Sequence, residues 1–306
     1  MTGALLSLVL FWSPLIAQQP LTPRTSASQS AKDDPRFAEI ESLLEQGRPD
    51  EAKRKIGDAL RQDPSSVEAY NLLGIVCISQ KDYTGASDAL RHALKLNPAS
   101  PRTRNNLGNL YVAQQRLDLA EKEFREVLRA LPSNADANYN LGLVLLATDK
   151  PAEAIPHLQR VLPANTPAQL NLLRAYLRAS RIAQGLRVAD ELSTRNPKDV
   201  QLHFTLGTIL ASEKQYRAAQ RELEKANSLQ PETFEILFNL AQTYLRLRDY
   251  RQAELVCKRA QSLKPESPET LYLLAQVYSE QSRPVDALEL LVRAHKLAPE
   301  NTDIIF

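Results

Sequence analysis

Leucine, glycine and alanine return at fixed positions along the chain when it is divided into units of 34 residues. Most units carry leucine at position 7, glycine or alanine at position 8, and alanine at position 20. These residues are Leu73, Leu107, Leu141, Leu206, Leu240 and Leu274; then Gly74, Gly108, Gly142, Gly207, Ala241 and Ala275; then Ala52, Ala86, Ala120, Ala154, Ala219, Ala253 and Ala287. The chain is rich in strong helix formers. The pattern therefore predicts paired helices that cross closely where positions 8 and 20 lack large side chains.

Prolines mark the end of each unit. Pro64, Pro98 and Pro132 are spaced by 34 residues, and a second series with the same step comprises Pro163, Pro197, Pro231, Pro265 and Pro299. Proline cannot continue a helix, so each is expected to end the second helix of its unit. Only 31 residues separate the two series. This predicts that the fourth unit's second helix is about one turn shorter, with a local change of superhelical pitch around residues 155–170.

The 34-residue period, with several positions in one register, resembles the tetratricopeptide-repeat family over residues 33–306. The resemblance implies an all-α fold, an α-solenoid in which about eight helical hairpins form a right-handed superhelix. The first helix of each unit would line the concave face. The units are expected near residues 33–66, 67–100, 101–134, 135–165, 166–199, 200–233, 234–267 and 268–301, followed by a short apolar tail.

Two units depart from the pattern of small residues. The first unit has Ile40 at position 8, and terminal repeats are often atypical because they cap a stack. The fifth unit has Leu173 at position 8 and Gly185 at position 20, so its small residue lies only on the second helix.

Composition argues against catalysis, metal binding and nucleic-acid binding. The formal net charge is +2, and no basic stripe with interleaved aromatic residues is present. The four histidines fall at unrelated positions of different units, and no catalytic or metal-ligating motif occurs. The two cysteines, Cys77 and Cys257, are expected to be small buried side chains. We therefore predict a non-enzymatic protein without a cofactor, which binds a protein or peptide and neither nucleic acid nor metal.

Asparagines recur at positions 5, 6 and 9, which share one face of the first helix with position 2. They are Asn71, Asn105, Asn106, Asn109, Asn140, Asn171 and Asn239. Because an amide both donates and accepts hydrogen bonds, a row of amides can hold an extended peptide by its backbone. The alternative is that these amides bond to neighbouring helices or to water. Arg102 and Arg174, at positions 2 and 9, are expected to add contacts to carboxylates.

Aromatic residues at position 5 form a second row, which consists of Tyr139, Phe204, Phe238 and Tyr272. Core packing is the simpler interpretation of such a row. In the resembled family, however, position 5 lies beside the groove, so partial exposure is also expected. A groove that is rich in amides in its middle and aromatic toward its end would suit an extended or helical apolar peptide.

Both ends of the chain carry apolar segments. Residues 4–17 are apolar and precede a polar stretch, as in a secretory signal peptide, although no lysine or arginine comes first. Residues 1–17 are thus predicted to be a signal peptide and residues 18–32 a linker. We therefore expect the protein to be secreted or periplasmic, or cytoplasmic if the leader does not function. We expect contact with a membrane only if the leader is not cleaved. The tail of Ile304, Ile305 and Phe306 is expected to fold back or to mediate self-association.

The sequence therefore predicts an exported interaction scaffold or adaptor that binds an extended peptide or a partner protein in its concave groove. The alternative is an assembly scaffold, or a regulatory subunit with an enzyme on another chain, that uses its convex face or C-terminal end.

Overall fold

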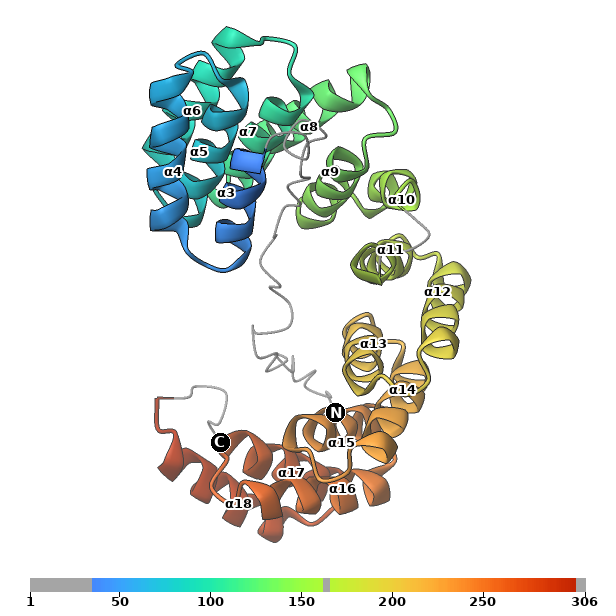
Figure 1. Ribbon diagram of the computed structural model, residues 1–306. Coiled ribbons are helices and arrows are strands. Elements are labelled where there is room, and N and C mark those ends of the chain that lie inside the picture. The colour runs from blue at the N-terminus through green and yellow to red at the C-terminus, as the bar shows by residue number, and fades with distance from the viewer. Residues whose placement is uncertain (1–34, 162–165, 301–306) are drawn as a thin grey trace. The chain divides into compact units, whose positions relative to one another are not determined.

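The computed structural model describes residues 35–161 and 166–300, and all the regular secondary structure within these ranges is α-helical. The helices follow one another in pairs along the chain (Figure 1). They are α3 (Pro35–Glu45), α4 (Pro49–Gln62), α5 (Val67–Ser79), α6 (Tyr83–Leu96), α7 (Pro101–Ala113), α8 (Leu117–Ala130), α9 (Ala135–Ala147), α10 (Pro151–Gln159), α11 (Thr166–Arg178), α12 (Ile182–Arg195), α13 (Val200–Ser212), α14 (Tyr216–Leu229), α15 (Phe234–Arg246), α16 (Tyr250–Leu263), α17 (Pro268–Glu280) and α18 (Pro284–Leu297). The predicted all-α solenoid of eight hairpins is confirmed.

The described chain divides into two compact bodies between Ser180 and Arg181. The N-terminal body holds α3–α11 and the C-terminal body holds α12–α18. The division falls inside the fifth unit, whose position 8 is occupied by the fully buried Leu173 in place of glycine or alanine.

The fourth unit has the shortened second helix that the proline spacing predicts. Helix α10 has nine residues, whereas the other second helices have 14. The predicted change of pitch near residues 155–170 stays a prediction, and residues 162–165 lie outside the described residues.

The close crossing within a hairpin occurs at the glycine of position 8. A Cβ atom built on Gly108 would lie 2.5 Å from Cε1 of Phe124, which is fully buried at position 24 of the second helix. The same clash would arise between Gly74 and Leu90, Gly142 and Leu158, and Gly207 and Leu223. The space that glycine leaves is thus filled by the side chain of position 24.

The turns and ends of the helices also repeat. Position 15, between the two helices of a unit, adopts a left-handed backbone in all eight units; these residues are Gly47, Lys81, Gln115, Asp149, Ser180, Lys214, Arg248 and Ser282. Position 34 caps most first helices with a side-chain oxygen, as Ser100 does for the amide of Thr103. These features end and start helices by satisfying backbone groups that have no partner inside a helix.

The core accommodates a large residue at position 8 of the first unit as well as both cysteines. Ile40 at position 8 of the first unit is buried in a cluster with Phe37, Ala52 and Ile56, so a large residue is accommodated there. Cys77 and Cys257 are both free and buried, as predicted.

We expect Gly108→Ala to lower the free energy of unfolding by about 1–3 kcal/mol, because the new methyl group meets a buried ring that has no free space. Urea denaturation followed by circular dichroism measures this change. Gly57→Ala in α4 is the matched control, since its Cβ would have only the tip of Arg61 nearby at 3.9 Å. The control should stabilise the protein by about 0.5–1 kcal/mol, as alanine does in a helix. Equal effects of the two changes would contradict the close-crossing account.

Candidate functional site

The predicted amide row lies on the first helices of the N-terminal body. Asn71 belongs to α5, Asn105, Asn106 and Asn109 to α7, Asn140 to α9 and Asn171 to α11. All six side chains are buried. Since polar groups are seldom buried without hydrogen bonds, the partners of each amide decide what the row can do.

Part of the row bonds to itself across neighbouring units. Nδ2 of Asn140 donates to Oδ1 of Asn109 at 3.0 Å and to Oδ1 of Asn105 at 3.4 Å. Asn140 therefore connects α9 to α7 through both amides. This is the alternative that the sequence left open, in which asparagines bond to neighbouring helices.

The next pair of helices is connected in a related way. Nδ2 of Asn171 donates to the hydroxyl of Tyr139 at 3.4 Å and to the carbonyl of Pro167 at 3.0 Å. Nη1 of Arg174 donates to Oδ1 of Asn171 at 3.0 Å. The amide of Asn171 is thus held between its own helix and α9.

Four amide atoms of the row are buried without a hydrogen-bond partner. They are Oδ1 of Asn71, Nδ2 of Asn109, and both Oδ1 and Nδ2 of Asn106. Asn106 is 1% exposed, and both polar atoms of its side chain are buried without a hydrogen bond to the described residues. An unpaired buried amide atom costs roughly 1–3 kcal/mol. The row therefore holds donor and acceptor capacity that the described residues do not use.

Arg102 contacts carboxylates, but these belong to the protein itself. Its guanidinium donates to Oε1 of Glu41 at 3.1 Å and forms a second ion pair with Glu68. The carboxylates come from α3 and α5. The charge of Arg102 is therefore balanced within the protein, and its main role is to join three successive first helices.

The aromatic row is divided between the two bodies. Tyr139 lies in the N-terminal body and is buried, whereas Phe204, Phe238 and Tyr272 lie in the C-terminal body and are half-buried. The ring of Phe238 stacks on Phe234 with centroids 5.8 Å apart. Asn239, the last predicted amide, donates to the carbonyl of Glu235 in its own helix at 2.8 Å. The Nδ2 donor of Asn239 is therefore used within α15.

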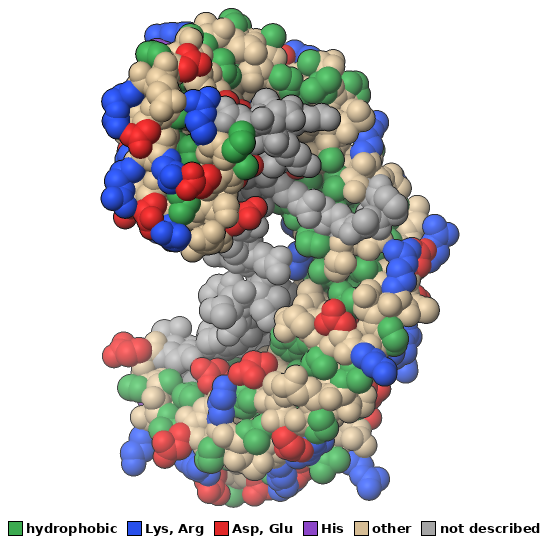
Figure 2. Space-filling view, viewed as in Figure 1, with side chains coloured by type: hydrophobic (Ala, Val, Ile, Leu, Met, Phe, Trp, Pro, Cys, Tyr) green, Lys and Arg blue, Asp and Glu red, His purple; other side chains and the backbone are tan. Residues whose placement is uncertain are grey.

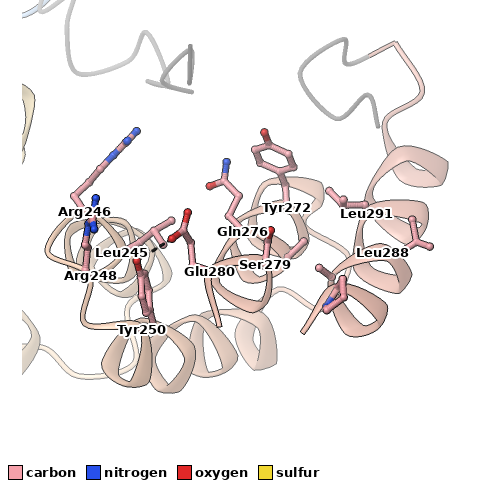
Figure 3. A pocket seen from close by; sticks show the side chains of 13 residues that line it. Leu245, Arg246, Arg248, Tyr250, Tyr272, Gln276, Ser279, Glu280, Leu288 and Leu291 are labelled. Atoms are coloured by element: carbon pink, nitrogen blue, oxygen red, sulfur yellow. Dashed lines mark hydrogen bonds between the residues drawn. The ribbon is translucent and has the colours of Figure 1, made fainter. Parts of the chain in front are cut away.

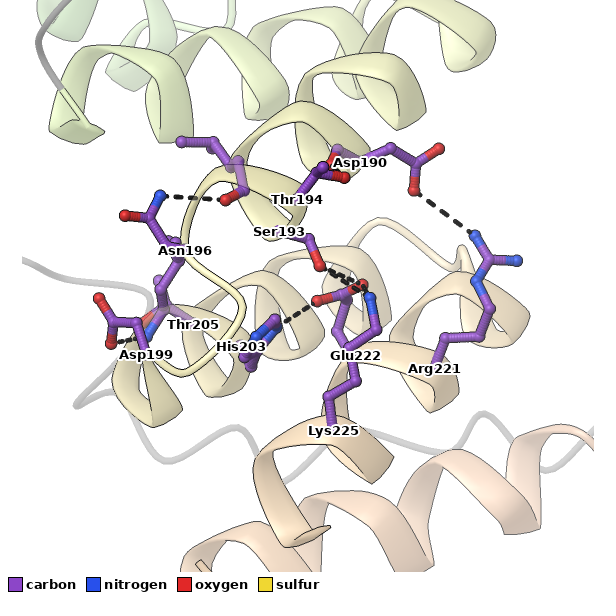
Figure 4. A network of polar contacts seen from close by, with 12 residues as sticks. Asp190, Ser193, Thr194, Asn196, Asp199, His203, Thr205, Arg221, Glu222 and Lys225 are labelled. Atoms are coloured by element: carbon purple, nitrogen blue, oxygen red, sulfur yellow. Dashed lines mark hydrogen bonds and ion pairs between the residues drawn. The ribbon is translucent and has the colours of Figure 1, made fainter. Parts of the chain in front are cut away.

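A buried polar network, which the sequence analysis did not predict, lies in the C-terminal body (Figure 4). Nδ1 of His203 in α13 is 2.7 Å from Oε2 of Glu222 in α14. Oε1 of Glu222 accepts from Oγ of Ser193 in α12 at 3.2 Å and from Nζ of Lys225 at 2.8 Å. Lys225 also donates to Ser193 at 2.7 Å. The network therefore connects α12 to the hairpin of α13 and α14 through hydrogen bonds.

A repeated spacing could have revealed this network. His203 and Glu222 occupy positions 4 and 23 of their unit, which are 19 residues apart. The same two positions bring Nη1 of Arg104 to Oε2 of Glu123 at 3.2 Å, and Nδ1 of His157 to Oδ1 of Asn138 at 2.9 Å. Two polar residues at this spacing therefore pair across a hairpin in three units.

The carboxyl of Glu222 is held in its charged form. Burial by itself raises its pKa, but the hydrogen bonds from Lys225 and His203 outweigh that effect, so the pKa of Glu222 lies below its ordinary value. A carboxyl whose pKa is lowered by folding stabilises the folded state above its unfolded pKa. This stabilisation is lost as the pH falls through the lower pKa of the folded state.

We expect Glu222→Gln to lower the free energy of unfolding by about 1–3 kcal/mol at neutral pH, because it removes the negative charge to which three side chains are hydrogen-bonded. The difference from the wild-type protein should shrink as the pH is lowered below the ordinary glutamate pKa of about 4.3. Urea denaturation at several pH values measures it. Glu289→Gln, at an exposed carboxylate of α18, should show no such pH-dependent difference. A constant difference at every pH would contradict the role of the Glu222 charge.

Charged side chains are mixed on the visible face of the molecule. Figure 2 shows basic and acidic side chains interspersed, without a large area of one sign on that face. Within residues 35–161 and 166–300, no group of three or more histidine, cysteine or acidic residues is placed to hold a metal ion. In the same ranges no helix has the length and hydrophobicity needed to cross a membrane.

The sequence matches models of a known protein family. Two models described as tetratricopeptide repeat match residues 37–101 and 105–169, and residues 210–277, which together cover well over half of the chain. No curated protein matches the sequence.

Solved structures with similar folds share little sequence. A tetratricopeptide repeat protein from Parabacteroides merdae is 18% identical, with a TM-score of 0.54; the match covers 82% of this chain and 99% of that one. A chain of the APC/C hetero-tetramer Cut9-Hcn1 is 15% identical, with a TM-score of 0.51 over 91% of this chain. The present chain spans 55% of the length of that second structure. At such low identity, these likenesses concern the fold alone.

Proposed function

Because this chain belongs to the tetratricopeptide-repeat family, we propose that it is a non-catalytic interaction scaffold that binds an extended segment of a partner protein along its first helices. The observation that carries this proposal is Asn106, whose buried amide has neither atom bonded. An extended peptide offers a free N–H and a free C=O at each residue, and an asparagine amide is complementary to both.

The neighbouring amides support the same interpretation. Asn71 has a free acceptor and Asn109 a free donor, so unused capacity extends from α5 to α7. Asn140, by contrast, uses Nδ2 for two bonds to α7, which holds the amides of Asn105 and Asn109 in place. A row in which some amides orient others, and some remain unsatisfied, is suited to a ligand whose backbone completes it. Because Asn106 is buried, binding requires a local movement that opens its amide to the peptide.

We expect Asn106→Leu to leave the unfolding free energy of the free protein unchanged or slightly raised, since an apolar group of similar size replaces an amide without bonds. Asn140→Leu is the matched comparison on the next first helix and should cost about 1–3 kcal/mol, because it breaks two bonds. Urea denaturation of the two variants decides between a ligand-directed amide and a structural one. Equal destabilisation by both would assign Asn106 to the structure of the free protein.

The binding arm of this experiment uses random peptides displayed on phage and selected on the full chain. Fluorescence anisotropy of the selected peptides should show that Asn106→Leu weakens binding about tenfold, equivalent to one or two hydrogen bonds. Replacing peptide side chains with alanine should matter less than N-methylation of the peptide backbone. Unchanged affinity for Asn106→Leu would refute the proposed role of the amide row.

We propose further that the scaffold acts outside the cytoplasm. The support is the apolar segment of residues 4–17 and the polar stretch that follows, both of which lie outside the described residues. If the leader is cleaved after Ala17, the mature protein begins at Gln18. N-terminal sequencing of the protein from the native cell envelope tests this. A chain that keeps Met1 would contradict cleavage, and its absence from the envelope would contradict export.

A further inference from the structure

The last described hairpin exposes side chains that are covered in the other hairpins. Position 24 of the second helix is almost fully buried in the preceding units, as in Leu223 and Cys257, but the corresponding Leu291 of α18 is only half-buried. Leu288, three residues before it, is 53% exposed. Both leucines line a pocket of about 780 Å³, which is within the range of ligand-binding pockets.

The preceding unit shows what normally covers these positions. In α16 the thiol of Cys257 at position 24 approaches the carbonyl of Thr270 at 3.6 Å, and Glu254 at position 21 accepts from Nε2 of Gln281 at 3.0 Å. Both partners belong to the next unit. Leu288 and Leu291 stand at the same two positions of α18, and no described helix lies over them.

The pocket continues from α18 past α17 to the end of α15 (Figure 3). Tyr272, which the sequence analysis placed in the aromatic row, and Gln276 lie between the two ends. The wall therefore combines an exposed and a half-buried leucine, an aromatic ring and an amide, all within the C-terminal body.

The far end of the pocket carries two arginines. Arg246 ends α15, and Arg248 occupies the left-handed turn position that follows it. No ion pair or side-chain hydrogen bond joins either guanidinium to the described residues, whereas Arg283 and Arg259 in the same body are paired with carboxylates. In Figure 3 the side chain of Arg246 extends away from the helices.

Among the described residues that line the pocket, Glu280 is the one carboxylate, and it accepts a hydrogen bond from within the protein. Oε2 of Glu280 accepts from the hydroxyl of Tyr250 at 2.8 Å. The hydrogen bond to Glu280 raises the pKa of Tyr250, as expected when a hydroxyl donates to a carboxylate. The two arginines therefore leave an excess of positive charge at one end of a pocket that is apolar at the other end.

We propose that this pocket binds a segment of a partner protein that carries an aspartate or glutamate close to aliphatic side chains. The carboxylate would pair with Arg246 and Arg248, and the aliphatic side chains would cover Leu288 and Leu291 as a further repeat would do. Charge complementarity places the acidic residue of the segment at the arginines and its aliphatic residues across α17 at the leucines. This inference rests on the proposed function and specifies a second, chemically different binding site for it.

The test selects random phage-displayed peptides on the full chain carrying Asn106→Leu, so that binding through the amide row is already impaired. The selected peptides should be rich in acidic residues next to leucine, isoleucine or valine. The double variant Arg246→Glu/Arg248→Glu should weaken their binding at least about tenfold, and more at low salt than at high salt. Peptides with lysine in place of the acidic residue should regain binding to this double variant.

Matched variants in the same body control for charge and hydrophobicity. Arg217→Glu/Arg251→Glu makes the same charge change at two exposed arginines outside the pocket, and should leave binding unchanged. Leu288→Lys should weaken binding, whereas Leu255→Lys, at a leucine that is 55% exposed on α16, should not. Circular dichroism verifies that each variant stays helical.

Three results would overturn the inference. One is equal loss of binding in the pocket and control variants. Another is a change in sedimentation of the protein alone upon Leu288→Lys, which would assign the pocket to a second copy of the chain. The third is peptide binding that appears only after deletion of residues 302–306, which would assign the pocket to the chain's own end. None of these results bears on the Asn106 comparison, so failure of the pocket and failure of the amide row remain distinguishable.

Discussion

The close approach of two helices at position 8 determines how every other side chain of a hairpin is directed. Where Gly108 meets Phe124, the backbone of α7 lies directly against a buried ring, and there is no room for a Cβ atom. This contact fixes the rotation of the first helix about its axis. Positions 5, 6 and 9 then lie on a different side of that helix, because successive residues are separated by about 100°. The direction in which the amide row faces is therefore set by the packing at position 8.

Polar groups between neighbouring units add directional contacts to this apolar packing. Asn140 joins α9 to α7, Arg102 joins α7 to α3 and α5, and Ser193 and Glu222 join α12 to α14. In a repeat protein, stability depends on the interfaces between nearest neighbours. Each of these bonds thus stabilises one interface and also fixes the relative position of side chains on successive first helices, which is what a site made from several repeats requires.

The period, the hairpins and the shortened α10 could be predicted from the sequence because they depend on local rules, such as proline at a helix end and small residues at a crossing. The hydrogen-bond partners of polar groups could not be predicted, because they depend on distances between different units. The spacing of Asn106 and Asn140 predicted that they share one face. It did not predict that Asn140 would be hydrogen-bonded and Asn106 would not. Arg102 looked available for a ligand because its partners, Glu41 and Glu68, lie 61 and 34 residues earlier in the chain. Only the 19-residue spacing of His203 and Glu222 left a signal that the sequence analysis could have found.

The two candidate sites differ in what the repeat leaves unsatisfied. In the N-terminal body, the amide of Asn106 is buried without a partner, so the unsatisfied element is a pair of hydrogen-bonding atoms. In the C-terminal body, Leu288 and Leu291 occupy interface positions that no described helix covers, so the unsatisfied element is apolar surface. Hydrogen bonding is directional and recognises the backbone of a ligand, whereas burial of apolar area is not directional and gains its specificity from Arg246 and Arg248 beside it. A single fold, repeated with small changes, can therefore offer one surface that is tolerant of ligand sequence and another that selects for charge.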